Sequence, residues 1–449
     1  MITVSEFANQ KIGVFGLGIA GEAAVASLTA GKAQIFAWDD KKTVEEGIYS
    51  NFTNWPWTQL KALVLSPGIP LTHPKPHAVV EMAKKHNVPI IGDIELLYRA
   101  CPNAIYIGIT GTNGKSTTTT LIGHIFKTAG LKTEVGGNLG TPALALAPLA
   151  TGEIYVIETS SYQLDLLQTI RFNVTVLLNI TPDHLDRHGN MEGYIEAKMH
   201  IFERQQKSDT AVIAVDDDYM RKALADIEKN GQQRIIKVSA HDTLRTGIYV
   251  QNAELHDGKF TCDLSGIATL TGRHNWQNAA AAYAAARACG IAPKVIYKAM
   301  QSFAGLRHRL QLVATIKGVR FINDSKATNA DATSNALAPY DTIYWILGGK
   351  PKAGGISTLT EYFPKIIHAF LIGEAQDEFA KTLDGKAPYT RSGTLEMAVK
   401  QAADMAFKDG RKNAVVLLSP ACASFDQFKS FEHRGDVFCE LVEQLKHAS

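Results

Sequence analysis

The stretch ITGTNGKST at residues 109–117 limits the folds open to this chain more than any other. The apolar residues 104–109 predict a buried strand before it, and the residues from Lys115 onward predict a helix after it. In such a glycine-rich turn from a strand to a helix, backbone N–H groups surround phosphate. The strict spacing G-x-x-x-x-G-K-[ST] is not met, because Ile109 stands where its first glycine would be.

We therefore expect ATP or GTP to bind at this loop. Lys115 would reach the terminal phosphates, and the Ser116 hydroxyl suits Mg²⁺. The alternative is a glycine-rich turn with a solvated lysine, and the strand–loop–helix setting argues against it. The residues expected to hold the nucleotide are Gly111, Thr112, Asn113, Gly114, Lys115, Ser116 and Thr117.

A second glycine-rich loop, GLGIAG, begins at Gly16, between the apolar run 11–15 and the helix predicted at 22–30. Asp39 follows Gly16 by 23 residues, at the end of the next predicted strand. This is the setting of the dinucleotide fingerprint, in which the loop approaches a pyrophosphate and the acid approaches a ribose. We expect a nucleotide diphosphate here, although a turn that needs glycine only for packing is the alternative. The loop alone does not distinguish NAD from other nucleotides.

Strands followed by helices recur along the chain, and this alternation predicts an α/β fold with parallel sheets covered on both faces. Residues 208–271 are polar and rich in turn residues, and we expect short strands there. At about 150 residues per domain, the 449 residues predict three domains, with limits at 1–93, 94–305 and 306–449. Strands are expected at 11–15, 34–38, 61–65, 104–109, 153–157, 172–178, 319–323, 342–347, 366–372 and 414–419, and helices at 22–30, 115–129, 191–203 and 275–289.

Charge and composition exclude several classes of protein. The formal net charge is +2, so no basic excess exists to attract a nucleic acid. Five cysteines without a C-x-x-C pair indicate reduced thiols in the cytoplasm. No apolar stretch approaches the roughly 18 residues that span a bilayer, and the start of the chain does not read as a secretion signal. We expect a cytoplasmic protein that acts on small molecules.

Ionisable side chains follow the central predicted strands. Glu158 ends the strand predicted at 153–157, where nucleotide-binding domains carry a Mg²⁺-binding acid. His184 and His188 have a spacing found in zinc sites, but Leu185 stands where H-E-x-x-H needs a base. A solvated turn accounts for the two histidines equally well.

Lys198 falls on the apolar face of the helix predicted at 191–203, because Ile195, Lys198 and Phe202 recur at helical spacing. A lysine on such a face usually extends its ammonium group to water. If Lys198 is instead buried, its pKa should fall, and the neutral amine could take up CO₂ to form a carbamate ligand for Mg²⁺. The spacing does not decide between these two hypotheses.

Taken together, the motifs resemble the Mur ligase family, in its D-glutamate-adding branch, and they follow the family order over nearly the whole chain. The stretch 419–435 points to that branch, whereas TGTNGK and NDSKATN are typical of Mur ligases in general. The motifs are GLGIAG (16–21), LSPGIP (65–70), GDIEL (92–96), TGTNGKST (110–117), GGNLG (136–140), ETSSYQLD (158–165), NITPDHLDRHG (179–189), GRHNWQNAAAA (272–282), LRHR (306–309), NDSKATN (323–329) and SPACASFDQFKSFEHRG (419–435).

The resemblance implies a Rossmann-like N-terminal domain for a UDP sugar, a central P-loop ATPase-type domain, and a Rossmann-like C-terminal domain that delivers D-glutamate. The implied activity is ATP-dependent addition of D-glutamate to UDP-N-acetylmuramoyl-L-alanine, through an acyl phosphate and a tetrahedral intermediate. The implied cofactors are ATP, two Mg²⁺ ions and a carbamate on Lys198. We also expect a monomer, and a closing movement of the C-terminal domain during catalysis.

The resemblance also assigns site residues by position. The catalytic set is Lys115, Asn138, His184, Lys198 and Lys326, and the metal set is Ser116, Glu158, His184 and Lys198. Beyond the P-loop, the nucleotide contacts are Asn278, Arg309 and Asp324, with His308 next to them. The substrate contacts are Gly18, Ile19, Asp39, Asp40, Ser160, Thr328, Lys352, Ser424 and Phe431.

Some positions depart from the pattern of the family. Asp40 and Lys41 stand where a Thr-Arg pair would be better placed to hold uracil or phosphate, which leaves the uracil contact open. Lys350 could meet the D-glutamate carboxylate in place of Lys352.

The alternative functions are those of other Mur ligases, of a folylpolyglutamate synthase, of an NAD-dependent oxidoreductase and of a P-loop switch protein.

Overall fold

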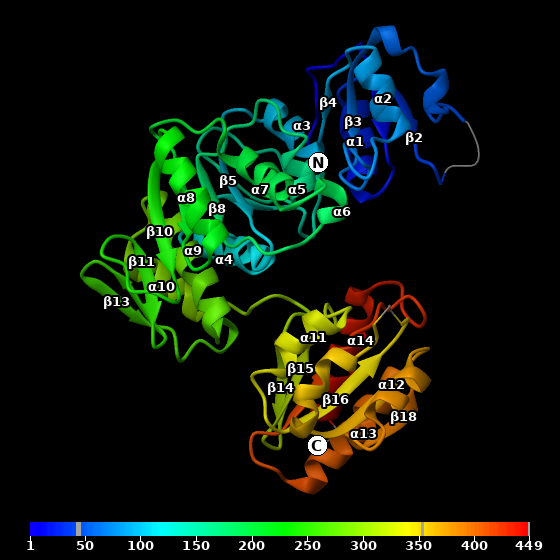
Figure 1. Ribbon diagram of the computed structural model, residues 1–449, viewed down its shortest axis with the longest axis vertical. Coiled ribbons are helices and arrows are strands. Elements are labelled where there is room, and N and C mark those ends of the chain that lie inside the picture. The colour runs from blue at the N-terminus through cyan, green and yellow to red at the C-terminus, as the bar shows by residue number, and fades with distance from the viewer. Residues whose placement is uncertain (42–45, 352–353, 448–449) are drawn as a thin grey trace. The chain divides into compact units, whose positions relative to one another are not determined.

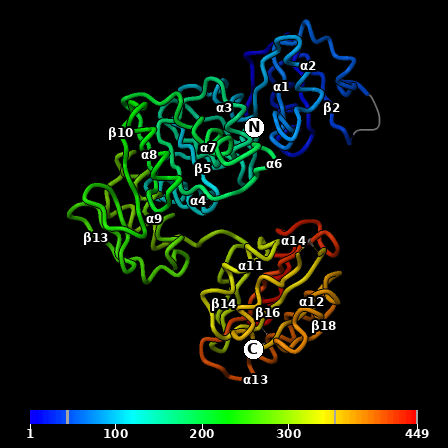
Figure 2. Tube along the Cα trace, in the orientation of Figure 1, coloured from blue at the N-terminus to red at the C-terminus, as the bar shows by residue number. Residues whose placement is uncertain are grey.

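The computed structural model describes residues 1–41, 46–351 and 354–447. Its contacts divide the chain into two units, Met1–Phe303 and Ala304–Ser449, and the trace in Figure 2 passes once from the first to the second. The first unit holds two sheets and the second holds one (Figure 1). None of the helices in the described ranges combines the length and the apolar character needed to cross a membrane.

The N-terminal sheet is parallel, with strand order β2-β1-β3-β4. Successive side chains of a strand point to opposite faces. Val14 and Val64 therefore pack with α1, whereas Phe15 and Leu65 pack with α2 on the other face. The elements are β1 (Lys11–Phe15), α1 (Ile19–Ala30), β2 (Gln34–Trp38), β3 (Leu60–Leu65), α2 (Ala78–Lys85), β4 (Ile90–Ile91) and α3 (Asp93–Ala100).

The central sheet has the strand order β13-β12-β11-β10-β9-β8-β5-β7-β6. Its pairs are parallel from β6 to β11, while β12 and β13 pair antiparallel. Its strands are β5 (Ile105–Thr110), β6 (Thr133–Gly137), β7 (Ile154–Glu158), β8 (Val174–Leu177), β9 (Thr210–Ala214), β10 (Arg234–Ser239), β11 (Ile248–Gln251), β12 (Glu254–Asp257) and β13 (Phe260–Asp263). Its helices are α4 (Lys115–Thr128), α5 (Ser161–Leu164), α6 (Leu185–His188), α7 (Met191–Met199), α8 (Asp218–Asn230), α9 (Arg273–Ala288) and α10 (Pro293–Gln301).

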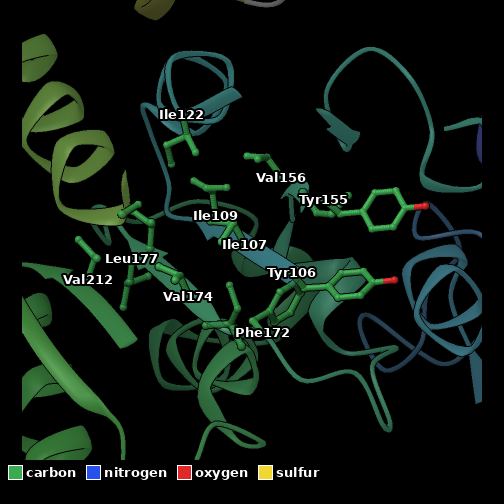
Figure 3. Close-up of a cluster of buried hydrophobic side chains, with 14 of the residues drawn as sticks. Tyr106, Ile107, Ile109, Ile122, Tyr155, Val156, Phe172, Val174, Leu177 and Val212 are labelled. Atoms are coloured by element: carbon green, nitrogen blue, oxygen red, sulfur yellow. The ribbon is translucent and has the colours of Figure 1, made fainter. Parts of the chain in front are cut away.

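The core of the first unit continues through the central sheet (Figure 3). Ile107 and Ile109 of β5 lie with Ile122 of α4, and the rings of Tyr106 and Tyr155 stack with centroids 5.2 Å apart. The site residues at the carboxyl ends of β5 and β7 therefore stand on closely packed strands.

The second unit has a six-stranded sheet in the order β14-β15-β19-β16-β17-β18, parallel except for the β14–β15 pair. Trp345 and Leu347 pack with α11 and α12, and Tyr344 and Ile346 pack with α13 and α14 on the other face. The elements are β14 (Gln311–Ile316), β15 (Val319–Asn323), α11 (Ala330–Leu337), β16 (Ile343–Gly348), β17 (Ile366–Ile372), α12 (Gln376–Leu383), β18 (Tyr389–Gly393), α13 (Leu395–Asp409), β19 (Val415–Leu418) and α14 (Phe431–His447).

The predicted α/β class is confirmed, and each of the predicted strands matches an observed strand to within two residues at either end. The expectation of only short strands over 208–271 is wrong, because α8 occupies Asp218–Asn230 within that range. Its buried Met220, Ala223 and Ile227 have helical spacing, and the Asp217 side chain accepts a hydrogen bond from the Met220 N–H at the helix start. The antiparallel strands β12, β13 and β14 are a second departure from all-parallel sheets. The domain limits at 93 and 305 stay a prediction.

Glu95 of the GDIEL motif joins α3 to the loop before β8. Its buried carboxylate accepts hydrogen bonds from the N–H groups of Gln168 (2.9 Å) and Thr169 (3.0 Å) and from the Arg99 side chain (2.9 Å). Burial alone would raise the pKa of Glu95, but the hydrogen bonds from Thr169, Gln168 and Arg99 outweigh it and lower the pKa below its usual value.

We expect Glu95→Gln to lower the free energy of unfolding of the first unit by about 2 kcal/mol at pH 7, since hydrogen bonds to a charged group are weakened. Because its folded-state pKa is lowered, the Glu95 carboxylate stabilises the fold above the unfolded-state pKa of about 4.3. This stabilisation is lost as the pH falls through the folded-state pKa. The difference between variant and wild type in urea unfolding should therefore shrink below about pH 4. Glu6→Gln is the control, because Glu6 contacts the same Arg99 at 3.4 Å from an exposed position. A similar loss in both variants would contradict this account.

Candidate functional site

The P-loop is shaped by two glycines between β5 and α4. Gly111 and Gly114 have φ values of +148° and +82°, which residues with a side chain rarely adopt. A Cβ atom at Gly114 would lie 2.2 Å from the Asn278 side-chain oxygen, so α9 leaves no room for one. That oxygen also accepts a hydrogen bond from the Thr118 hydroxyl at 3.3 Å. The predicted nucleotide contact Asn278 thus lies beside the start of α4.

The segment that follows β8 holds the P-loop in place. The Asn179 side chain accepts from the Asn113 N–H (2.7 Å) and donates to the Asn113 carbonyl (3.1 Å). The Thr112 hydroxyl accepts from the Thr181 N–H at 3.0 Å. Sequence reasoning gave Asn179 no role. Its place after a strand adjacent to β5 was the available signal, because parallel strands end at a common edge of the sheet.

Two lysines converge on the Gly111 carbonyl. The Nζ atoms of Lys115 and Lys198 both donate to this oxygen, each at 2.9 Å. Lys198 is 1% exposed, and its Nζ lies 4.6 Å from the centre of the Tyr194 ring. Burial and the nearby Lys115 charge lower the pKa of Lys198 to about 7. The hypothesis of a buried Lys198 is therefore confirmed, and the side chain does not extend to water.

Glu158 ends β7 as predicted and is 2% exposed. One carboxylate oxygen accepts from the Asn138 side-chain amide at 2.9 Å, and the other is buried and has no hydrogen-bond partner among the described residues. Such an unsatisfied carboxylate oxygen suits a divalent cation that prefers oxygen ligands. Ser116 is also buried, on the first turn of α4. This donor set fits Mg²⁺.

The histidines of the 179–189 motif have different surroundings. His184 has a left-handed backbone (φ +52°), and its half-exposed ring lies 4.9 Å from that of Tyr162. His188 is buried, its Nε2 lies 2.9 Å from the Ser161 hydroxyl, and burial lowers its pKa. Within the described ranges no group of three or more His, Cys, Asp or Glu side chains is placed to hold a metal ion. The predicted contact Ser160 caps the start of α5, where its hydroxyl accepts from the Gln163 N–H.

The N-terminal loop is closely built around Gly16 and Gly21. The Gly16 carbonyl accepts from the Ser66 hydroxyl at 2.8 Å, and a Cβ at Gly21 would lie 1.9 Å from this carbonyl oxygen. The Asp39 carboxylate accepts from the Leu17 N–H at 2.7 Å, which ties the end of β2 to the loop. The predicted contact Ile19 is 79% exposed.

Asp40, which departs from the family pattern, pairs with His77, its carboxylate lying 3.1 Å from Nε2. The His77 Nδ1 accepts from the Val79 N–H at the start of α2. In the neutral ring Nε2 therefore carries the hydrogen and donates to Asp40.

In the second unit, Asp324 is buried at the end of β15. Its carboxylate accepts from the Ser419 hydroxyl (2.8 Å) and the Leu310 N–H (3.1 Å), and burial raises its pKa to about 7. Arg309 lies between His308 and Leu310, which both have positive φ. The predicted nucleotide contacts Arg309 and Asp324 are thus joined through one short backbone segment.

Arg434 holds three loops of the second unit and was missed by sequence reasoning. Its buried guanidinium donates to the Ser325 hydroxyl and carbonyl, each at 2.9 Å, and to the Cys422 carbonyl at 3.2 Å. It also reaches the Gly348 and Ala423 carbonyls at 3.5 Å. Burial lowers the pKa of Arg434 to about 10, which leaves it charged at neutral pH.

These loops carry the residues predicted to meet D-glutamate. Ser424 is buried, Thr328 is half-buried, and Lys326 Nζ lies 5.3 Å from the centre of the Phe431 ring. Lys350 is exposed and pairs with Ala423, whereas Lys352 lies outside the described residues.

Two segments of the chain match families of known proteins. Residues 109–286 match the Mur ligase middle domain, and residues 308–422 match the Mur ligase, glutamate ligase domain. The chain is 48% identical to a UDP-N-acetylmuramoylalanine–D-glutamate ligase of Rhodospirillum rubrum, over 100% of this chain and 97% of that protein. It is 49% identical to the protein of the same name from Paramagnetospirillum magneticum, over 99% and 98% of the two chains.

Solved structures show the same fold at low identity. The UDP-N-acetylmuramate-alanine ligase MurC of Thermotoga maritima has a TM-score of 0.60 and 17% identity, covering 97% of this chain and 100% of its own. MurF of Acinetobacter baumannii has a TM-score of 0.61 and 18% identity, covering 98% of this chain and 93% of its own.

We expect Gly21→Ala to weaken binding of UDP at least tenfold, because the new Cβ would force the Gly16 carbonyl out of the loop. Gly266→Ala is the matched control: it lies outside this loop at an exposed position, and none of the described residues comes within 4 Å of its added Cβ. Titration calorimetry with UDP measures both. If the two variants bind UDP equally well, the loop is not where the nucleotide binds.

Proposed function

Because the chain belongs to the Mur ligase family, in its D-glutamate-adding branch, we propose that its central P-loop site activates a carboxylate with ATP for attack by D-glutamate. The protein is a ligase of peptidoglycan precursor synthesis, and its substrates are UDP-N-acetylmuramoyl-L-alanine and D-glutamate. Membership in this branch sets aside the oxidoreductase and the switch protein. We place the reaction in the cytoplasm and expect the enzyme to act as a monomer.

One observation carries the mechanism: Lys115, Lys198 and the Glu158–Asn138 pair all lie at the carboxyl edge of β5 and β7. A carboxylate does not react with an amine until one oxygen becomes part of a good leaving group. Phosphoryl transfer needs little covalent help from a protein and depends on positioning and on charge stabilisation. This edge offers both, on strands that the core holds rigid.

The reaction proceeds in two steps. In the first, the L-alanine carboxylate oxygen of the UDP substrate forms a bond to the γ-phosphorus, and the bond to the β-phosphate oxygen breaks, which releases ADP. In the second, the D-glutamate nitrogen attacks the acyl carbon, and the tetrahedral oxyanion collapses with loss of phosphate and of the amine proton. Lys115 leaves the Gly111 and Thr112 carbonyls to neutralise the transferring phosphoryl group, and the Asn138 amide and His184 lie beside the acyl phosphate.

Glu158, Ser116, His184 and a carbamate on Lys198 would hold Mg²⁺. When bound, Mg²⁺ neutralises phosphate charge that the side chains alone do not balance. Lys198 suits carbamate formation because a pKa of about 7 leaves a large neutral fraction at physiological pH. In the second unit, we assign D-glutamate to Thr328, Ser424, Phe431 and either Lys350 or Lys352, and the nucleotide to Arg309, Asp324 and Lys326.

We expect phosphate release from ATP only when UDP-N-acetylmuramoyl-L-alanine and D-glutamate are both present. L-Glutamate and L-lysine, tested at the same concentration, should give less than about a hundredth of this rate, because a site built for one carboxylate and amine arrangement leaves groups unpaired with another. A coupled assay for inorganic phosphate measures all three. Equal rates with the three amino acids would overturn the proposed function.

We expect Lys198→Ala to lower the D-glutamate-dependent rate at least a hundredfold, since an anionic ligand at the phosphoryl-transfer site is lost. Added formate or acetate should partly restore the rate, because a free carboxylate can replace the carbamate. Lys207→Ala is the control, because Lys207 is exposed beyond the end of the same helical segment. Full activity of Lys198→Ala without added acid would remove Lys198 from the site.

A further inference from the structure

Arg187 joins the two halves of the first unit through backbone oxygens. It lies on α6, three residues after His184, and its guanidinium donates to the carbonyls of Gly68 (3.0 Å), Ile69 (3.0 Å) and Pro67 (3.4 Å). These carbonyls belong to the segment that follows β3 of the N-terminal sheet. One side chain from the central domain thereby fixes three consecutive residues of the N-terminal domain.

On the central side, Arg187 rests on Tyr162. The guanidinium carbon lies 4.5 Å from the centre of the Tyr162 ring, which is in turn 4.9 Å from the His184 ring and 5.4 Å from the His188 ring. An arginine held flat on an aromatic ring presents its N–H groups in a fixed plane. The direction in which Arg187 reaches the N-terminal segment is therefore set by the same ring that packs against His184.

On the N-terminal side, the segment held by Arg187 contacts the glycine-rich loop. The Ser66 hydroxyl donates to the Gly16 carbonyl at 2.8 Å, and the Ile69 N–H donates to the Ser66 carbonyl at 3.0 Å. An unbroken series of contacts thus runs from Gly16 to His184. A narrow pocket follows the same line, and its walls include Leu65, Pro67, Ile69, Tyr162, Leu166 and Arg187.

We propose that Arg187 is a positioning residue that fixes the separation between the loop that holds the nucleotide of the UDP substrate and the site where its carboxylate is phosphorylated. This inference rests on the proposed function, because only a substrate held at both ends needs such a separation. The reacting carboxylate oxygen of this substrate must lie within about 3–3.5 Å of the γ-phosphorus. A displacement of about 1 Å from that position lowers the rate on the order of a hundredfold. Lysine cannot replace arginine here, since one ammonium group does not span three carbonyls in a plane.

The test compares Arg187→Lys and Arg187→Met with wild type in three measurements. Titration with UDP alone and with a non-hydrolysable ATP analogue alone should give affinities within about threefold of wild type, because neither variant alters the loop that holds UDP or the P-loop that holds ATP. For UDP-N-acetylmuramoyl-L-alanine, kcat/KM should fall at least tenfold in both variants, while the KM for D-glutamate stays within about threefold. Arg221→Lys, on the exposed face of α8, is the control and should change none of these.

Tyr162→Leu removes the ring beneath Arg187 and should give the same pattern, and the double variant should lose no more than either single one, because both changes break one contact series. An unchanged kcat/KM in Arg187→Lys overturns the inference. So does a parallel loss of UDP and ATP-analogue affinity, which would make Arg187 a residue of general stability. If wild type shows no D-glutamate-dependent phosphate release, the proposed function fails instead, and the two failures are separate.

Discussion

The phosphoryl-transfer site depends on a single backbone oxygen, the Gly111 carbonyl, which accepts hydrogen bonds from both Lys115 and Lys198. Bringing a second ammonium group into a buried place next to the first is costly, because like charges repel and neither is well solvated. The fold tolerates it because the Tyr194 ring and this carbonyl surround Lys198 and because its amine gives up a proton easily. A strongly basic lysine becomes a side chain that can carry either charge state near neutral pH.

The sequence was most informative where chemistry depends on side-chain type and spacing. Ile195, Lys198 and Phe202 recur at helical spacing, and this spacing raised the hypothesis of a buried lysine without deciding it against a lysine that extends to water. The place of Glu158 at the end of a strand followed from the apolar run before it. The helix α8 was missed although Met220, Ala223 and Ile227 carried its signal, because the polar residues between them resembled a turn-rich region.

Residues that act on backbone oxygens left no comparable signal. Arg187 and Arg434 bind main-chain carbonyls, which every residue possesses, so no partner residue type marks these contacts in a sequence. Asp39 illustrates the same limit differently. Its position predicts a ribose contact, which stays a prediction, whereas the structure shows that its carboxylate accepts a hydrogen bond from the Leu17 N–H. The fold class can be predicted from the pattern of apolar residues, whereas the arrangement of the loops can be seen only in the three-dimensional structure.

The buried carboxylate of Glu158 has a consequence for how this protein can evolve. When no cation is bound, a buried carboxylate oxygen that none of the described residues hydrogen-bonds would lower the stability of the fold by about 1–3 kcal/mol. An uncharged residue at this position would relieve the penalty, so selection for heat tolerance alone would favour losing the acid. We therefore expect selection for catalysis to preserve the acid. Stability and activity are thus opposed at a single atom, and stabilising changes must arise elsewhere in the chain.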